Sequence, residues 1–374
     1  MKNSIRLFRV LGIEVGLDYS WFLVFALLTW TLASQVFPRA NWRWSASFTW
    51  TLSVLTSLLF FTSVLVHEFS HSLVALATGV PVRRITLFVF GGIAELAREP
   101  SHALDEFLIA VAGPLASLLL AAGFGALWLL GHWLEVRSLT ALGGWLGGIN
   151  LSLAAFNLIP GFPLDGGRMF RAVIWGLTRN LAKATRLAAH LGQGVAYVFI
   201  FWGIWRVFHG GWIEGIWIAF IGWFLMSAAT QSVQQVALRQ LLAGFTARDV
   251  MTTDCPAVPP QLTLDILVDQ MIMPTGRRCF PVVEGAHLMG LVTLHRIKEA
   301  GRDRWPATHV RDVMIPREEM IVARPDESLE VIFERMTSDG VNQLPVIDQQ
   351  GRMIGLVARD HVLSFLRTRA ELTA

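Results

Sequence analysis

Long uncharged stretches separated by short polar segments fill the first 230 residues of the chain. A helix needs about 20 apolar residues to cross the hydrocarbon core of a bilayer. Six stretches approach or exceed that length, at residues 19–37, 48–78, 105–132, 141–163, 190–208 and 212–230. The pattern therefore predicts a polytopic α-helical membrane protein with about six spans.

The hydrophobic pattern changes after residue 231, where charged residues recur every few positions. ARDVM at 247–251 returns as VRDVM at 310–314, and GLV at 290–292 returns at 355–357. Each copy carries a helical pattern followed by two short strands. The repeat predicts two α+β units of about 60 residues. We expect these units to pair, because neither copy alone buries much core.

A short apolar and β-branched segment, residues 83–96, lies between the second and third predicted spans and contains Gly91 and Gly92. This composition favours a β-hairpin over a helix, with an ordinary short loop as the alternative. The expected organisation is a membrane domain at 1–230, a helical connector at 231–245, and repeats at 246–301 and 302–374.

Composition agrees with a membrane protein, since 53% of the residues are hydrophobic and the mean hydropathy is +0.51. The net charge is +3, but the basic residues lie at the ends of apolar segments and form no single patch. Nucleic acid is therefore not an expected partner. Glu14 and Asp18 interrupt the N-terminal apolar stretch, which predicts an uncleaved first span. Cys255 and Cys279 have no CxxC spacing and imply no disulfide framework.

Lysine and arginine are unevenly distributed over the loops between the predicted spans. Counted with the ends of the spans that border them, alternate loops carry 11 of these residues on one side and 4 on the other. The positive-inside rule then places the N- and C-termini in the cytosol of a multi-pass protein of the cell (inner or plasma) membrane.

The sequence His67-Glu68-Phe69-Ser70-His71 carries the strongest chemical signal. Positions i and i+4 share a helix face, so both imidazoles can reach one tetrahedral zinc, while Glu68 can act as a general base. The preceding residues 50–66 contain no charge, and ionisable groups inside a membrane helix are costly unless they have a function. The alternative is a satisfied polar cluster at a helix end.

Two histidines leave a catalytic zinc one protein ligand short. Asp165 is the best third ligand, because it ends the predicted fourth span among helix-breaking Pro and Gly residues. The second and fourth spans run in the same direction, so His67 and Asp165 should lie at similar depth. A solvated carboxylate in a helix-stop turn is the alternative for Asp165. Asn157 could stabilise an oxyanion, orient Asp165, or serve as a structural amide.

HEFSH in the second span, a Gly-Gly hairpin after it, and NLIPGFPLDGG in the fourth resemble the site-2 protease family of intramembrane zinc metalloproteases. The resemblance covers about residues 1–230. It implies that His67, His71 and Asp165 bind one zinc, that Glu68 is the base, and that Asn157 matches the Asn of the family motif. It also implies regulated intramembrane proteolysis, with a single-span membrane protein as the expected substrate.

The C-terminal repeats resemble the tandem CBS domains of a prokaryotic subgroup of this family, a class that often binds adenine nucleotides. Many such repeats have an Asp shortly after the GLV strand, where this chain has Arg296 and His361. Nucleotide binding, homodimer formation through the repeats and a docking role therefore stay open. A CBS-regulated transporter or channel and a catalytically silent membrane scaffold remain the alternative functions.

Overall fold

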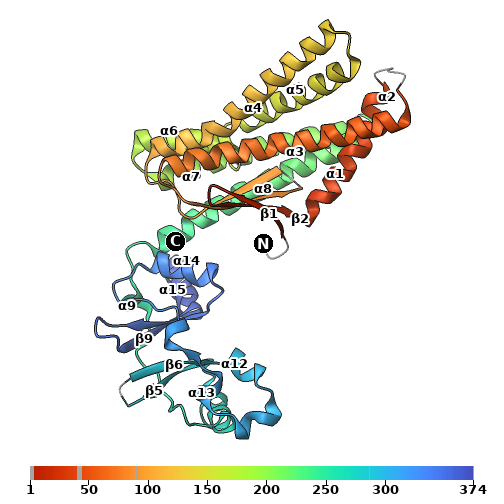
Figure 1. Cartoon of the computed structure of the whole chain (residues 1–374). Helices are drawn as coiled ribbons and strands as arrows, with labels where there is room; N and C mark the ends of the chain where they lie inside the picture. The colour runs from red at the N-terminus through yellow and green to blue at the C-terminus, as the bar shows by residue number, and fades with distance from the viewer. Residues whose placement is uncertain (1–3, 40–43, 90, 286, 374) are drawn as a thin grey trace. The chain divides into compact units, whose positions relative to one another are not determined.

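The computed structural model describes residues 4–39, 44–89, 91–285 and 287–373 and divides into two compact units, residues 1–236 and 237–374 (Figure 1). Among the described residues, six helical segments are long and apolar enough to cross a membrane. They are Tyr19–Arg39 (α1 Tyr19–Thr31, η1 Leu32–Val36 and α2 Phe37–Arg39), α3 Ala46–Ala77, α4 Ala103–Trp133, α5 Arg137–Asn157, α7 Leu181–Phe208 and α8 Trp212–Leu242. The predicted class of polytopic α-helical membrane protein is confirmed.

Helices α4 and α5 form an antiparallel pair whose backbones approach closely (Figure 1). A Cβ added to Gly131 would lie 2.6 Å from the backbone nitrogen of Thr140, and one added to Gly143 would lie 2.6 Å from that of Trp128. Small residues at such contacts let membrane helices pack by dispersion without a hydrophobic driving force.

Two strands before α3 in the sequence and two after it form one four-stranded sheet. They are β1 Ser4–Val10, β2 Ile13–Asp18, β3 Val82–Phe88 and β4 Gly91–Leu96. The strand order is β1-β2-β3-β4, and only the β2 and β3 pair is parallel. The predicted hairpin is therefore present, although Gly91 and Gly92 lie within β4. The two N-terminal strands were not predicted. The sequence feature that could have predicted them is Gly12 between two β-compatible runs. In the structure, Leu11 and Gly12 form the turn and both have positive φ.

The predicted fourth span is wrong at its C-terminal end. Helix α5 stops at Asn157, and Asp165 begins a separate helix, α6 Asp165–Thr178. Pro160 and Pro163 lie between them in a loop, because proline removes a helix hydrogen bond and clashes with the preceding turn. Asp165 therefore lies in the first turn of a helix, not at the end of a membrane span.

The C-terminal unit contains the two predicted repeats of helix and paired strands. Its elements are α9 Ala247–Val250, α10 Leu264–Leu267, η2 Val268–Ile272, α11 Met273–Thr275, β5 Cys279–Glu284, β6 His287–Thr293, α12 Leu294–Glu299, η3 Arg302–Ala307, α13 Val310–Val313, β7 Ile315–Pro316, η4 Arg317–Glu319, α14 Leu329–Ser338, β8 Gln343–Ile347, β9 Met353–Ala358 and α15 Arg359–Thr373. β5, β6 and β7 form one antiparallel sheet, and β8 and β9 form another.

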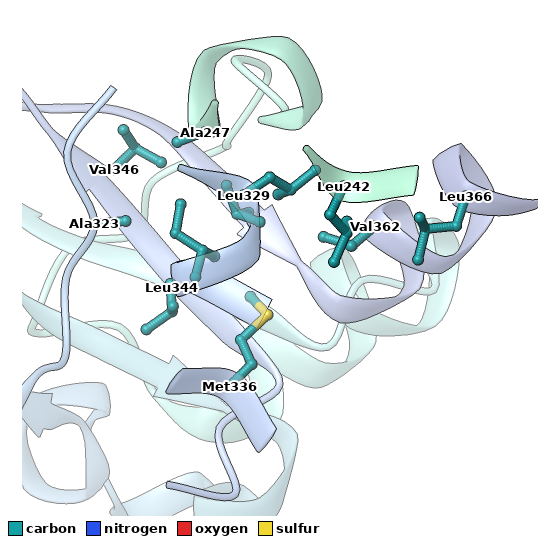
Figure 2. Close-up of a cluster of buried hydrophobic side chains, with 11 residues drawn as sticks. Leu242, Ala247, Ala323, Leu329, Met336, Leu344, Val346, Val362 and Leu366 are labelled. Carbon is teal, nitrogen blue, oxygen red and sulfur yellow. The ribbon is translucent and has the colours of Figure 1, made fainter. Parts of the chain in front are cut away.

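The two repeats exchange their first segments. Ala247 is buried in the core of the second repeat, and its N–H donates to the carbonyl of Glu327 at 3.0 Å (Figure 2). Val310 is buried in the core of the first repeat, and its N–H donates to the carbonyl of Leu262 at 2.9 Å. Each core is therefore completed by the other repeat, which gives the expected pairing a structural basis.

Candidate metal centre

Helix α3 places two histidines on one buried face. Its N-cap is Ser45, whose hydroxyl accepts a hydrogen bond from the N–H of Phe48. His67 and His71 are 4% and 6% exposed, and their Nε2 atoms lie 3.2 Å apart. The helical spacing predicted from the sequence thus brings both imidazoles to one point.

Asp165 completes the cluster from the first turn of α6. Its Oδ2 lies 3.2 Å from Nε2 of His67 and 3.2 Å from Nε2 of His71. The structure therefore brings together, across 94 and 98 residues of chain, the three side chains that the sequence proposes as metal ligands.

Helix α4 orients both histidine rings. Nδ1 of His71 donates to the carbonyl of Ile109 at 2.6 Å, since a carbonyl can only accept. Nδ1 of His67 lies 2.9 Å from the hydroxyl of Ser117. A neutral His71 with its proton on Nδ1 has an unprotonated Nε2, whose lone pair is available to a metal ion. Metal-binding histidines usually have such a partner on the second ring nitrogen.

Sequence reasoning missed this role of α4. Ile109, Gly113 and Ser117 are spaced by four residues and so share one face of the helix. A glycine and a serine four residues apart within an apolar span could have indicated that this face of α4 packs against the histidines.

Gly113 keeps open the space that the three ligand atoms face. A Cβ added there would lie 2.6 Å from Nε2 of His67 and closer still to Nε2 of His71. Ligand atoms about 2.0 Å from a tetrahedral zinc lie about 3.3 Å from one another, close to the 3.2 Å separations observed here. The donor set and its spacing therefore fit zinc.

Glu68 follows His67 on α3 and lies against strand β4. A Cβ added to Gly92 would collide with Cγ of Glu68 and lie 3.0 Å from its Cδ. Within the described residues, the Glu68 carboxylate has no hydrogen-bond partner in the protein. It is therefore held in place by packing and keeps its oxygens available.

Asn157 is partly buried at the end of α5, and the described part of the chain gives its side chain no hydrogen bond. The buried amide of α5 is Asn150, 1% exposed, whose Nδ2 donates to the carbonyl of Leu146 at 2.8 Å and to the hydroxyl of Ser63 at 3.3 Å. Ser63 lies one turn before His67. The structure thus does not join Asn157 to the cluster, and its role stays a prediction.

A second candidate site lies in the C-terminal unit, in a pocket of about 550 Å³. Its lining includes the basic residues Arg278, Lys298 and Arg359 and the acidic residues Glu319 and Asp360. His361 lies outside this lining, and its Nδ1 is 2.8 Å from the hydroxyl of Thr252. The sequence analysis looked for an Asp at the positions of Arg296 and His361. It therefore overlooked Asp360, which directly precedes His361 and lines the pocket.

The sequence matches Peptidase family M50 over residues 55–133 and 131–201 and the CBS domain over residues 247–303 and 310–368. It is 34% identical to the putative zinc metalloprotease sll0528 of Synechocystis, over 99% of this chain and 97% of that protein. It is 32% identical to the putative zinc metalloprotease Rip3 of Mycobacterium tuberculosis, over 97% of this chain and 92% of that protein.

Among solved structures, the site-2 protease of Methanocaldococcus jannaschii is 28% identical, with a TM-score of 0.42, over 62% of this chain and 95% of that one. The full-length similarity to sll0528 and Rip3 decides the family. The chain belongs to Peptidase family M50, the site-2 protease family, with tandem CBS domains. It is a multi-pass membrane zinc metalloendopeptidase.

Proposed function

We propose that this enzyme hydrolyses peptide bonds within or next to the transmembrane segments of other membrane proteins, in regulated intramembrane proteolysis. The observation that carries the proposal is the His67, His71 and Asp165 cluster, which is enclosed by helices long and apolar enough to span a bilayer. Ionisable groups at such a position are retained for function.

The residues of the site divide the chemistry among them. His67, His71 and Asp165 would hold the zinc, and α4 orients the two histidines through Ile109 and Ser117. A zinc ion there supplies a Lewis acid that polarises a carbonyl and acidifies water toward a pKa of about 7. Glu68 accepts the proton from the attacking water and delivers it to the leaving amine.

Strand β4 is the proposed docking edge for substrate. It is the last strand in the sheet order, and its Gly92 abuts Glu68. A helical segment shields its own amides, so the substrate must become extended before cleavage. An extended segment that adds to a sheet edge gains main-chain hydrogen bonds, and here it would run beside the catalytic carboxylate.

The test compares wild type with Glu68→Gln, both purified in detergent, on a single-span membrane protein substrate. Wild type is expected to contain one zinc per chain and to cleave. Glu68→Gln should keep the zinc and lose cleavage, because an amide cannot accept the proton. His71→Ala is the control that should lose both.

Cleavage by the Gln variant at the wild-type rate would eliminate Glu68 as the base. A wild type without stoichiometric zinc would eliminate the metal site and favour a transporter, channel or scaffold. Membrane proteins that co-purify with Glu68→Gln and not with wild type are candidate substrates.

We further propose that the CBS pocket binds an adenine nucleotide and that its occupancy changes the rate of cleavage. Three basic residues suit a phosphate group, and the Asp360 carboxylate suits a ribose hydroxyl. Calorimetric titration with AMP and ATP tests binding. Asp360→Asn should weaken it, whereas Arg296→Gln, outside the pocket, should not.

Helix α8 offers a physical path for that regulation. Its C-terminal Leu242 is buried in the core of the second CBS repeat (Figure 2). Nη1 of Arg369 donates to the carbonyl of Leu241 at 2.8 Å, and its guanidinium lies 4.3 Å from the Phe245 ring centroid. A ligand that rearranges this repeat would therefore act directly on the end of a membrane helix.

The proposed orientation places both termini in the cytosol, with the CBS repeats exposed to cytosolic nucleotides. It is supported by the basic residues of the loops and of the span ends that border them, 11 against 4. Reporter fusions at each terminus test it. We also propose that the repeats can mediate a homodimer, which light scattering of the purified chain tests directly.

A further inference from the structure

A buried ion pair joins helices α4 and α6 within the membrane unit. Glu106 is 0% exposed and Arg171 is 9% exposed. Nε of Arg171 donates to Oε1 of Glu106 at 2.6 Å, and Nη2 of the same guanidinium also donates to that oxygen. Glu106 lies in the first turn of α4, where a negative charge is favoured by the helix dipole.

Glu106 belongs to the face of α4 that orients the histidines. It precedes Ile109, Gly113 and Ser117 by three, seven and eleven residues, a spacing that keeps all four on one side of the helix. The same face therefore contacts Arg171 at one end and both imidazoles along its length.

Arg171 lies on the helix that follows Asp165 and contacts the loop that precedes it. It lies on α6, less than two turns after Asp165. Its ion pair with Glu106 therefore attaches the start of α6 to α4. Its guanidinium also lies 5.0 Å from the centroid of the Phe162 ring, in the loop just before Asp165. Phe162 itself is buried, and its N–H donates to the carbonyl of Ala188 on α7 at 3.2 Å.

We propose that the Glu106 and Arg171 pair is a positioning device that sets Asp165 against His67 and His71, and thereby sets the zinc affinity. The proposal rests on the assignment of those three residues as zinc ligands. A buried ion pair is weak evidence for stability, since desolvation offsets its attraction, and apolar replacements of similar size are often neutral. However, an ion pair between Glu106 on α4 and Arg171 on α6 limits how far these two helices can move apart.

The central experiment uses the full chain and a double variant, Glu106→Leu with Arg171→Met. Removal of both charges leaves no unpaired buried ion, so this variant should keep a melting temperature near that of wild type. Its zinc affinity, from chelator competition with the metal-free protein, should fall about 10-fold. The visible absorption of the cobalt-substituted protein, which reports ligand geometry, should shift.

Arg171→Lys is the second variant and protects the test if the double variant fails to fold. Lysine keeps the charge but loses the planar fork and the ring stacking. It should therefore fold, weaken zinc binding and alter the cobalt spectrum. Either variant, folded and with the wild-type zinc affinity and cobalt spectrum, overturns the proposal.

Two controls separate positioning from general destabilisation. Gly131→Ala forces a contact with Thr140 at the other end of α4, so it should lower the melting temperature and leave zinc affinity unchanged. Glu214→Gln removes an exposed ion pair with Arg206 and should change neither. An equal loss of zinc in Gly131→Ala would assign the effect to stability and overturn the proposal. A wild type that binds no zinc would instead overturn the proposed function.

Discussion

Gly113 and Gly92 decide the chemistry of this site by leaving room for their neighbours. Gly113 faces the imidazoles of His67 and His71, and Gly92 faces the side chain of Glu68. One glycine therefore opens the metal site, and the other seats the base. Protein interiors are too densely packed to absorb even one added methyl group at such contacts.

We predict that Gly113→Ala abolishes stoichiometric zinc binding, because its Cβ would occupy the space between the ligand atoms. Metal analysis of the purified protein measures this. Gly123→Ala is the matched control on the same helix, since a Cβ there meets nothing within 4 Å. Full zinc content in Gly113→Ala would show that the ion lies elsewhere.

Burial also governs the two thiols of the first CBS repeat. Burial raises the pKa of Cys279 to about 12, so almost none of its thiol is ionised at pH 8. The pKa of Cys255 is raised as well, again by burial, but this residue is more exposed.

We predict that iodoacetamide at pH 8 labels Cys255 of the native protein well before Cys279, because alkylation requires an exposed thiolate. Mass spectrometry of peptides measures the two rates. Both cysteines should react equally after denaturation. Rapid native labelling of Cys279 would contradict the buried start of β5.

Among the elements of the fold, strand β4 packs against the catalytic helix α3, where Gly92 meets Glu68. Its pairing with β3 fixes the position of Gly92, and that position fixes the space available to Glu68 on α3. The hairpin is thus part of the active site and not only a connection between two spans.

We predict that Gly92→Ala lowers cleavage by at least 10-fold while zinc content stays at the wild-type level. The added methyl group displaces the Glu68 carboxylate without touching the metal ligands. Cleavage rate and metal content are measured on one preparation. Gly123→Ala, where an added Cβ meets nothing within 4 Å, should change neither quantity.

Helix α8 links the two units at the scale of the whole molecule. It runs unbroken from Trp212 to Leu242, through the segment predicted as a connector. Its last residues pack with the second CBS repeat, whose core also takes in Ala247 from the segment that follows. Folding of that repeat therefore depends on residues that lie before it in the sequence.

We predict that Leu242→Ala lowers the unfolding free energy of the C-terminal unit by about 2–4 kcal/mol, since Leu242 is 2% exposed. Denaturant unfolding measured at the CBS repeats reports this change. Zinc content should not change. Val331→Ala, 45% exposed on α14, should cost about 0.5 kcal/mol or less, and a similar loss in both variants would contradict the packing of Leu242.

The sequence by itself determined the six apolar helices, the hairpin after the second, the repeat in the C-terminal part and the shared face of His67 and His71. These features follow from the period of a helix or strand and from spans long enough to cross a bilayer, which are local properties. Asp165 was found because its neighbours break a helix, although the helix it begins was not foreseen.

Only the tertiary structure decided which faces meet. The orientation of His71 by Ile109, the pairing of Glu106 with Arg171 and the exchange of Ala247 and Val310 between repeats all join residues far apart in the chain. Periodicity indicates which face of a helix or strand is buried, but many other helices or strands could pack against that face. The choice among them depends on close packing of the whole fold, which no local pattern contains.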